Sequence, residues 1–177
     1  MKAPDSLTDG VVTLRKVREG DRAVVLSTMA DPVVRRWLNM PASPRDVDFD
    51  SLLRAVRVGF ASGDRLDYCV TTPPDDVSLG AVIASRRHRD NYELAYLSRP
   101  EGRGRGLMTR GVRVVCDWLF EAGVGRIEIR THPGNEPSQR LAERAGFRRE
   151  GVERRSIWLH NNREDAILWS LLPDDPR

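Results

Sequence analysis

The sequence is poor in lysine, cysteine and histidine, and it contains no long apolar run. The only lysines are Lys2 and Lys16, so nearly all of the positive charge is arginine, and the net charge is only +3. A net charge this small does not by itself indicate a protein that binds nucleic acid. No stretch approaches 18 consecutive apolar residues, which argues against a membrane-spanning helix, and we expect no membrane partner.

The few cysteines and histidines predict neither a disulfide framework nor a metal centre. Cys69 and Cys116 both lie in apolar runs, so we expect buried thiols, with a disulfide between them as the alternative. The three histidines, His88, His132 and His160, have no ligand spacing, and no metal is predicted. The N-terminal segment is polar and lacks the apolar core of a signal peptide. We therefore expect a cytoplasmic protein.

The order of the predicted elements indicates one α/β or α+β domain, residues 1–177, with a mixed sheet. No repeat, low-complexity tract or long linker divides the chain. Asp21 is predicted to cap a helix by accepting the free N–H groups of its first turn. Helices are expected at 21–30, within 31–40, at 44–63, 107–121 and 136–145. Strands are expected at 11–17, 66–72, 78–85, 92–98, 126–131, 147–158 and 164–172.

A glycine cluster, Arg103-Gly104-Arg105-Gly106, lies between a predicted strand and the clearest predicted helix. Glycine has no Cβ, so a ligand can approach the backbone closely. The free N–H groups and dipole of a helix start favour an anion, and a pyrophosphate suits this chemistry. A Walker loop would need Lys and Ser or Thr after its second glycine, and a dinucleotide loop would need glycine at Thr109. An arginine–glycine tract that binds RNA would need many repeats, and only one is present.

Three ordered segments resemble the GNAT superfamily of N-acetyltransferases, and within it the ribosomal-protein alanine acetyltransferase-like branch. Residues 99–115 look like the acyl-CoA pyrophosphate loop and its helix, although Glu101 stands where the superfamily usually has Gln or Arg. Residues 92–100 look like the strand before that loop, and residues 132–151 resemble the second signature. The resemblance implies a single-domain GNAT fold, with a mixed, mostly antiparallel sheet that is splayed at the acyl-CoA site and flanked by helices.

The resemblance also implies a reaction, in which an acyl group passes from acyl-CoA to a primary amine by direct attack. Acetyl-CoA is the expected donor, and a larger acyl group stays open. Ser138 is the candidate acid for the leaving thiolate, and Glu93 is the candidate base, with solvent as its alternative. Asn135 is also expected to cap helix 136–145. The implied cofactor-binding residues are Tyr96, Leu97, Arg103, Gly104, Arg105, Gly106, Met108, Thr109, Asn135 and Ser138.

Two other functions stay open. A non-catalytic acyl-CoA sensor would keep Gly104, Gly106 and Asn135 but use no base. A nucleic-acid-binding module would use the arginine-rich surface, although we do not expect nucleic acid as a partner. Ile157 stands where some ribosomal-protein members carry a glutamate, which argues against a ribosomal substrate. The expected acceptor is a protein N-terminus or a small molecule, and the sequence leaves open whether the chain forms a homodimer.

Overall fold

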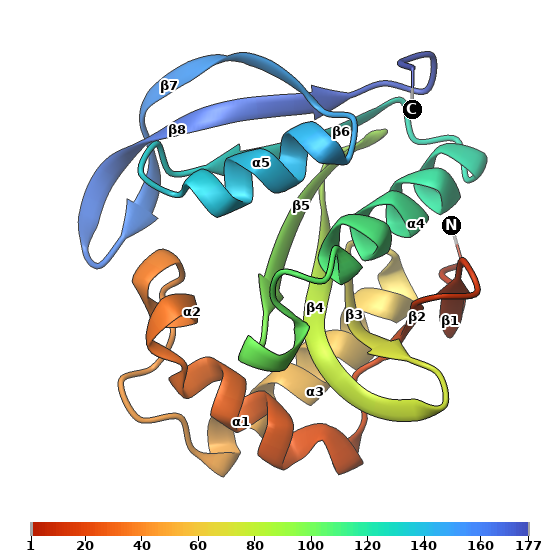
Figure 1. Cartoon of the computed structure of the whole chain (residues 1–177), viewed down its shortest axis with the longest axis vertical. Helices are drawn as coiled ribbons and strands as arrows, with labels where there is room; N and C mark the ends of the chain where they lie inside the picture. Colours follow the sequence, from red (N-terminus) through yellow and green to blue (C-terminus); the bar gives the residue numbers. More distant parts are fainter. Residues whose placement is uncertain (1, 177) are drawn as a thin grey trace.

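The strands of the protein form one eight-stranded sheet (Figure 1). The computed structural model describes residues 2–176. Across the sheet the strands lie in the order β1-β2-β3-β4-β5-β6-β8-β7, and only β5 and β6 pair in parallel among them. The mixed, mostly antiparallel sheet predicted from the sequence is therefore confirmed. In chain order the strands are β1 (Ser6–Thr8), β2 (Thr13–Lys16), β3 (Arg65–Thr72), β4 (Asp75–His88), β5 (Asn91–Ser98), β6 (Arg126–Thr131), β7 (Arg148–Leu159) and β8 (Asn162–Leu171).

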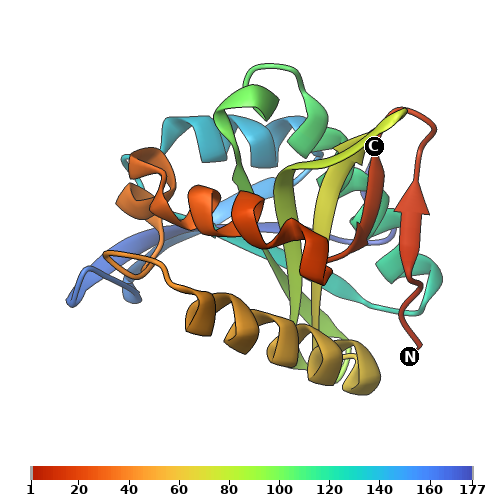
Figure 2. The ribbon, with the colours of Figure 1, turned by 90° about the horizontal axis from the view of Figure 1, so that it is seen from below.

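Helices cover both faces of this sheet. In Figure 2, α4 and α5 lie on one side of the strands and α3 lies on the other. Within residues 2–176, no helix is both long enough and apolar enough to cross a bilayer. The helices are α1 (Arg22–Ala30), α2 (Pro32–Trp37), α3 (Asp46–Ser62), α4 (Leu107–Glu121) and α5 (Glu136–Arg144), with short 3-10 helices η1 (Glu19–Asp21) and η2 (Pro100–Gly102).

Helix α4 approaches the sheet closely because Gly111 carries no side chain. A Cβ built at Gly111 would lie 3.2 Å from Cγ2 of Val70 on β3 and 3.5 Å from Cγ2 of Val82 on β4. Around this contact, Val112 and Val115 of α4 are fully buried in the core. The glycine costs about 1 kcal/mol of helix propensity relative to alanine, and the close packing explains why it stands in the middle of a helix.

The sheet opens between β5 and β6. The two strands pair from Asn91, opposite Arg126, to Leu94, opposite Ile129. Beyond Leu94, β5 continues to Ser98 and stays paired with β4, but within the described chain it has no partner on the β6 side. The predicted splay is therefore present, and it leaves residues 95–98 without a strand partner on that side, where the Ser98 carbonyl accepts from the Arg103 side chain.

Most of the predicted elements are present, with ends that differ by a few residues. The prediction misses β1, because three residues are too few to show an alternating pattern. The predicted strand 78–85 is also shorter than β4 at both ends, since Asp75, Asp76 and the basic residues 86–88 do not resemble a buried strand. The predicted hairpin of β7 and β8 is confirmed, and its turn residues His160 and Asn161 have positive φ angles of 50° and 65°.

The predicted capping role of Asp21 is wrong. Asp21 stands at the N-cap position of α1 but makes no capping hydrogen bond there. Its carboxylate instead accepts from the guanidinium of Arg15 at 2.8 Å and from the Arg18 N–H at 2.9 Å. The charged guanidinium is a stronger partner than a backbone amide, so the aspartate joins the turn to β2. Cys69 and Cys116 are buried and form no disulfide, as predicted.

Candidate active site

A cavity of about 710 Å³ lies at the opening between β5 and β6. Its walls come from β5, the loop before α4, the end of β6 and the start of α5, which lie far apart in the sequence. Among residues 2–176, no group of three or more His, Cys, Asp or Glu side chains is placed to hold a metal ion. The predicted site residues that line the cavity are Glu93, Tyr96, Leu97, Arg103, Gly104, Gly106, Met108, Thr109, Asn135 and Ser138.

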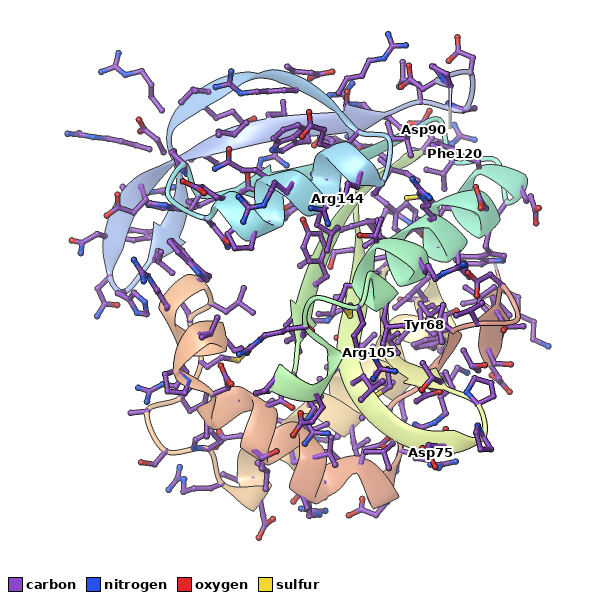
Figure 3. All side chains as sticks on the ribbon, viewed as in Figure 1. Tyr68, Asp75, Asp90, Arg105, Phe120 and Arg144 are labelled. Carbon is purple, nitrogen blue, oxygen red and sulfur yellow. The ribbon has the colours of Figure 1, made fainter. Side chains whose placement is uncertain are left out.

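Arg105 is the predicted site residue whose side chain lies outside this cavity. It is exposed on the loop before α4 (Figure 3), and its guanidinium donates to the Glu101 carbonyl at 3.3 Å. The Arg105 side chain therefore does not contribute to the cavity wall, and only its backbone remains a candidate for an anion contact.

The glycine loop presents backbone donors at the start of α4. Gly104 and Gly106 have positive φ angles of 71° and 73°, which residues with a Cβ rarely adopt. Gly106 is the N-cap residue of α4. In the part of the chain that the structure describes, the N–H groups of Gly104, Arg105 and Gly106 have no intramolecular partner. Together with the free first-turn N–H groups of α4, they form a site suited to an anion.

Arg103 is engaged differently from its predicted role. Its N–H, expected to meet a pyrophosphate, donates to the Pro100 carbonyl at 3.2 Å. Its guanidinium donates to Asp31 at 2.9 Å and to the Ser98 carbonyl at 3.2 Å. Asp31 also caps α2 by accepting the N–H groups of Val33 and Val34. Arg103 therefore ties the glycine loop to the first turn of α2.

Ser138 and Tyr96 form a hydroxyl pair on the opposite wall. The Tyr96 hydroxyl lies 2.9 Å from Ser138 Oγ and also 2.9 Å from the Ser138 carbonyl oxygen. Burial raises the pKa of Tyr96 to about 12, against a smaller opposing effect of the Ser138 hydrogen bond. The phenol is therefore neutral at physiological pH and can donate. Asn135 caps α5 as predicted, because its Oδ1 accepts the Ser138 N–H at 3.3 Å.

The sequence prediction names Tyr96 only as a cofactor-binding residue and does not include the pairing of its hydroxyl with Ser138. Its partner Ser138 is 42 residues away in the chain. The alternating pattern of residues 92–98 shows which side chains share a face of β5, but it gives no information about the helix that packs on that face.

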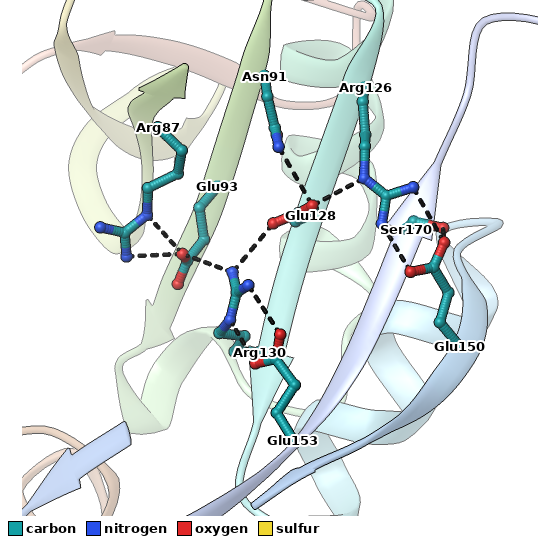
Figure 4. A network of polar contacts seen from close by, with 9 residues as sticks. All are labelled: Arg87, Asn91, Glu93, Arg126, Glu128, Arg130, Glu150, Glu153 and Ser170. Atoms are coloured by element: carbon teal, nitrogen blue, oxygen red, sulfur yellow. Dashed lines mark hydrogen bonds and ion pairs between the residues drawn. The ribbon is translucent and has the colours of Figure 1, made fainter. Parts of the chain in front are cut away.

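Glu93 lies in a network of ion pairs on β5, β6 and β7 (Figure 4). Its Oε2 accepts from Arg87 at 2.6 Å and from Arg130 at 2.9 Å. Arg130 also binds Glu128 at 3.0 Å and Glu153 at 2.7 Å. Two arginines therefore hold the Glu93 carboxyl group in position, where it contacts the cavity and the network at once.

Glu128, which lies opposite Glu93 in the parallel pair, is held in the ionised form. Burial opposes its ionisation, but hydrogen bonds from Arg126, Asn91 and Arg130 outweigh this effect and hold its pKa below the ordinary value. The network therefore keeps its negative charge at neutral pH.

A second, polar cavity of about 770 Å³ lies on the network side of the strands. In Figure 4 the network faces the viewer and helices lie behind the sheet, so this cavity opens away from α4 and α5. The two cavities share Glu93, Arg130, Ile157 and Trp158. The two cavities therefore adjoin at these residues, and a compound in the second cavity would contact the first cavity there.

Solved structures of known proteins share the whole fold. RimJ from Mycobacterium smegmatis, in complex with CoA-disulfide, has a TM-score of 0.84 and 21% identity, covering 97% of this chain and 88% of that one. The ribosomal-protein-S5-alanine acetyltransferase from Vibrio fischeri has a TM-score of 0.80 and 22% identity, covering 97% and 98%. At these identities, the similarity establishes the fold alone.

Sequence comparison identifies the family. The "Probable N-acetyltransferase YjcK" of Bacillus subtilis (strain 168) is 34% identical over 111 residues, which are 60% of this chain. That match spans only 61% of the length of YjcK. Residues 12–148 match the family model described as "Acetyltransferase (GNAT) domain". Because this match covers most of the chain, the protein belongs to the GNAT acetyltransferase family.

Proposed function

We propose that the protein is an N-acetyltransferase that transfers the acetyl group of acetyl-CoA to a primary amine. One observation carries the proposal: a single cavity has an anion site at one end and a pair of neutral hydroxyl groups on its wall, beside a strand with exposed backbone. Acetyl-CoA contains both a pyrophosphate and a thioester, so it would need both the anion site and the hydroxyl pair. All the strands of the described chain belong to one sheet, so we propose that residues 1–177 act as one N-acyltransferase domain.

The donor is proposed to lie along the opening between β5 and β6. The N–H groups of Gly104, Arg105 and Gly106 would bind the pyrophosphate, with Met108 and Thr109 continuing the contact at the start of α4. The pantetheine would pair with the exposed backbone of residues 95–98, and the Asn135 side chain would bind its amides. The solved RimJ relative contains CoA-disulfide, which supports a coenzyme A ligand for this fold.

The chemistry needs a neutral amine and a proton for the leaving thiolate. Glu93 is proposed to accept the ammonium proton while Arg87 and Arg130 hold its Oε2 in place. The amine nitrogen then forms a bond to the thioester carbon, and the carbon–sulfur bond breaks. Ser138 donates its proton to the thiolate, and the proton that the nitrogen loses as the amide forms returns to Ser138 through solvent, while Tyr96 orients the serine hydroxyl through their 2.9 Å contact.

The acceptor is proposed to be a protein N-terminus or a small-molecule amine, reaching the thioester from the side of the shared residues Glu93 and Trp158. Ile157 lines both cavities. Its apolar side chain stands where some ribosomal-protein members place a glutamate. We place the reaction in the cytoplasm, because Cys69 and Cys116 are both buried and not joined by a disulfide, which suits a reducing compartment.

Coenzyme A should raise the melting temperature of the protein, because a ligand bound only by the folded state stabilises it by mass action. At 100 times the Kd, the stabilisation is about 2.7 kcal/mol. Differential scanning fluorimetry with increasing coenzyme A measures this shift, with adenosine as the control that lacks the pyrophosphate. An unchanged melting temperature at millimolar coenzyme A would refute the proposal. A shift without thiol release from acetyl-CoA, across a panel of amines, would indicate the sensor instead.

Ser138→Ala should lower kcat by about tenfold, which is below the usual range for a general acid because a thiolate leaves readily. Tyr96→Phe removes one hydrogen bond of about 1 kcal/mol and should lower kcat by about fivefold. A thioester with a better leaving thiolate should restore most of the Ser138→Ala rate. Steady-state rates with both thioesters test this, and an equal loss with each of them would contradict the role of Ser138 as an acid.

A further inference from the structure

The side chain of Asn39 fastens the tip of the β7–β8 hairpin to the segment after α2. Its Nδ2 donates to the Trp158 carbonyl at 2.8 Å, and its Oδ1 accepts the His160 N–H at 2.8 Å. The His160 ring adds a contact of 3.2 Å to the Arg36 carbonyl. In Figure 1 the hairpin tip lies beside α2. Two segments about 120 residues apart are thus joined at this point.

The side-chain amide of Asn39 acts here like a peptide group in a β-bridge. It offers one donor and one acceptor to the backbone of the hairpin, and both are used. Aspartate at this position would lose the donor, and alanine would lose both groups. The two turn residues of the hairpin already have fixed, positive φ angles, so holding residues 158 and 160 fixes the whole tip.

The α2 side of this contact is held independently of the hairpin. Asp31 at the start of α2 binds Arg103 at 2.9 Å. Trp37 at its end packs against His132 of the segment after β6, with 5.2 Å between ring centroids. Loss of Asn39 would therefore release the hairpin tip and leave α2 in place.

The joined segments enclose the apolar mouth of the first cavity. Val33, Trp37 and Leu38 line it from the α2 side, and Trp158 and Leu159 line it from the hairpin. Val33 and Trp158 are large apolar side chains that remain 51% and 56% exposed. Apolar side chains at the rim of a cavity indicate a ligand group that covers them.

We propose that Asn39 is a positioning residue that sets the width of this mouth, and that the mouth selects acceptors whose amine carries an apolar group. This inference rests on the proposed acetyl transfer. The amine would reach Glu93 and Ser138, which line the same cavity, while its apolar neighbour lies between α2 and the hairpin. A wider mouth would hold the apolar group less well without changing the donor site.

The experiment compares the parent with Asn39→Ala, Asn39→Asp and a matched control, Asn162→Ala, which changes an asparagine of the same hairpin that does not contact α2. Hydrogen exchange measured by mass spectrometry reports on residues 157–163. We expect exchange about tenfold faster in Asn39→Ala, which loses both hydrogen bonds, and a smaller increase in Asn39→Asp, which loses only the one to the Trp158 carbonyl, with parental exchange in α4 of every variant. Unchanged exchange in the hairpin would overturn the positioning role.

Kinetics with two α-amines test the selection. For phenylalaninamide, KM should rise about fivefold in Asn39→Ala, while KM for alaninamide, kcat and the Kd of coenzyme A stay within about twofold. An equal rise for both amines, or an equal rise in Asn162→Ala, would overturn the proposal. Absence of turnover in the parent would refute the proposed acetyl transfer to these amines, and the exchange measurement would still decide whether Asn39 holds the hairpin.

Discussion

Gly106→Val should lower the affinity for coenzyme A by about 100-fold or more. The loop would lose backbone contacts to a charged pyrophosphate, each worth about 1.5–3 kcal/mol, and every 1.4 kcal/mol is a factor of ten in affinity. A valine at the φ of 73° found at Gly106 is strained, so the loop would leave the conformation that presents its N–H groups. A Cβ at this position meets no atom of the protein within 4 Å, so the core should be unaffected.

The matched control is Gly10→Val. Gly10 has a similar φ of 83° and also has no atom within 4 Å of an added Cβ, but it lies in the turn between β1 and β2. The two variants should lose similar stability, and only Gly106→Val should lose affinity. Isothermal titration calorimetry measures affinity, and thermal unfolding measures stability. Parental affinity in Gly106→Val would show that the pyrophosphate binds elsewhere.

Glu93→Gln should lower kcat by about 100-fold or more, the usual scale of general base catalysis. Coenzyme A affinity should stay close to the parental value, because Glu93 is not near the glycine loop in sequence or among the proposed phosphate ligands. The fold should persist, since Arg130 keeps its contacts with Glu128 and Glu153. The loss in kcat should be larger for a lysine-like acceptor, whose amine has a pKa of about 10.4, than for an α-amine, whose pKa is about 8.

Glu153→Gln is the control for the network. Glu153 binds the same arginine through two hydrogen bonds, but it does not line the cavity of the proposed reaction. Its substitution disturbs Arg130 without removing the proposed base. Steady-state kinetics on a verified acceptor separate the roles. Equal losses in the two variants would assign Glu93 a structural role in the ion pairs, and solvent would then carry the proton.

The fold, the conformation of the glycine loop and the cap of α5 could be predicted because their signals are local. Glycine before an amphipathic helix predicts an anion site from neighbouring residues alone, and Gly104 and Gly106 have the expected backbone conformation. Asn135 likewise caps α5 within one turn. Such features depend on residues a few positions apart, which periodicity and capping rules describe well.

The contacts that join distant segments around the cavity could not be predicted. The pairing of Tyr96 with Ser138 depends on how α5 packs on β5. The contact of Asn39 with the hairpin depends on a separation of about 120 residues. Likewise, Asp21 suits a helix cap by its position, and only the folded structure brings it to Arg15. Where a local partner and a distant partner compete for one side chain, the sequence does not show which of them the side chain binds.

The opening between β5 and β6 also has a cost for solubility. Residues 95–98 form an unpaired strand edge in the interior of the sheet. Proteins usually protect such edges from pairing with other chains by placing charge or proline there. The residues here are Ala95, Tyr96, Leu97 and Ser98, none of which gives that protection, and the proposed donor would have to reach the same backbone. We therefore expect the ligand-free protein to be more prone to aggregation at this edge than the protein with coenzyme A bound, because the proposed pantetheine would occupy the place of a pairing strand.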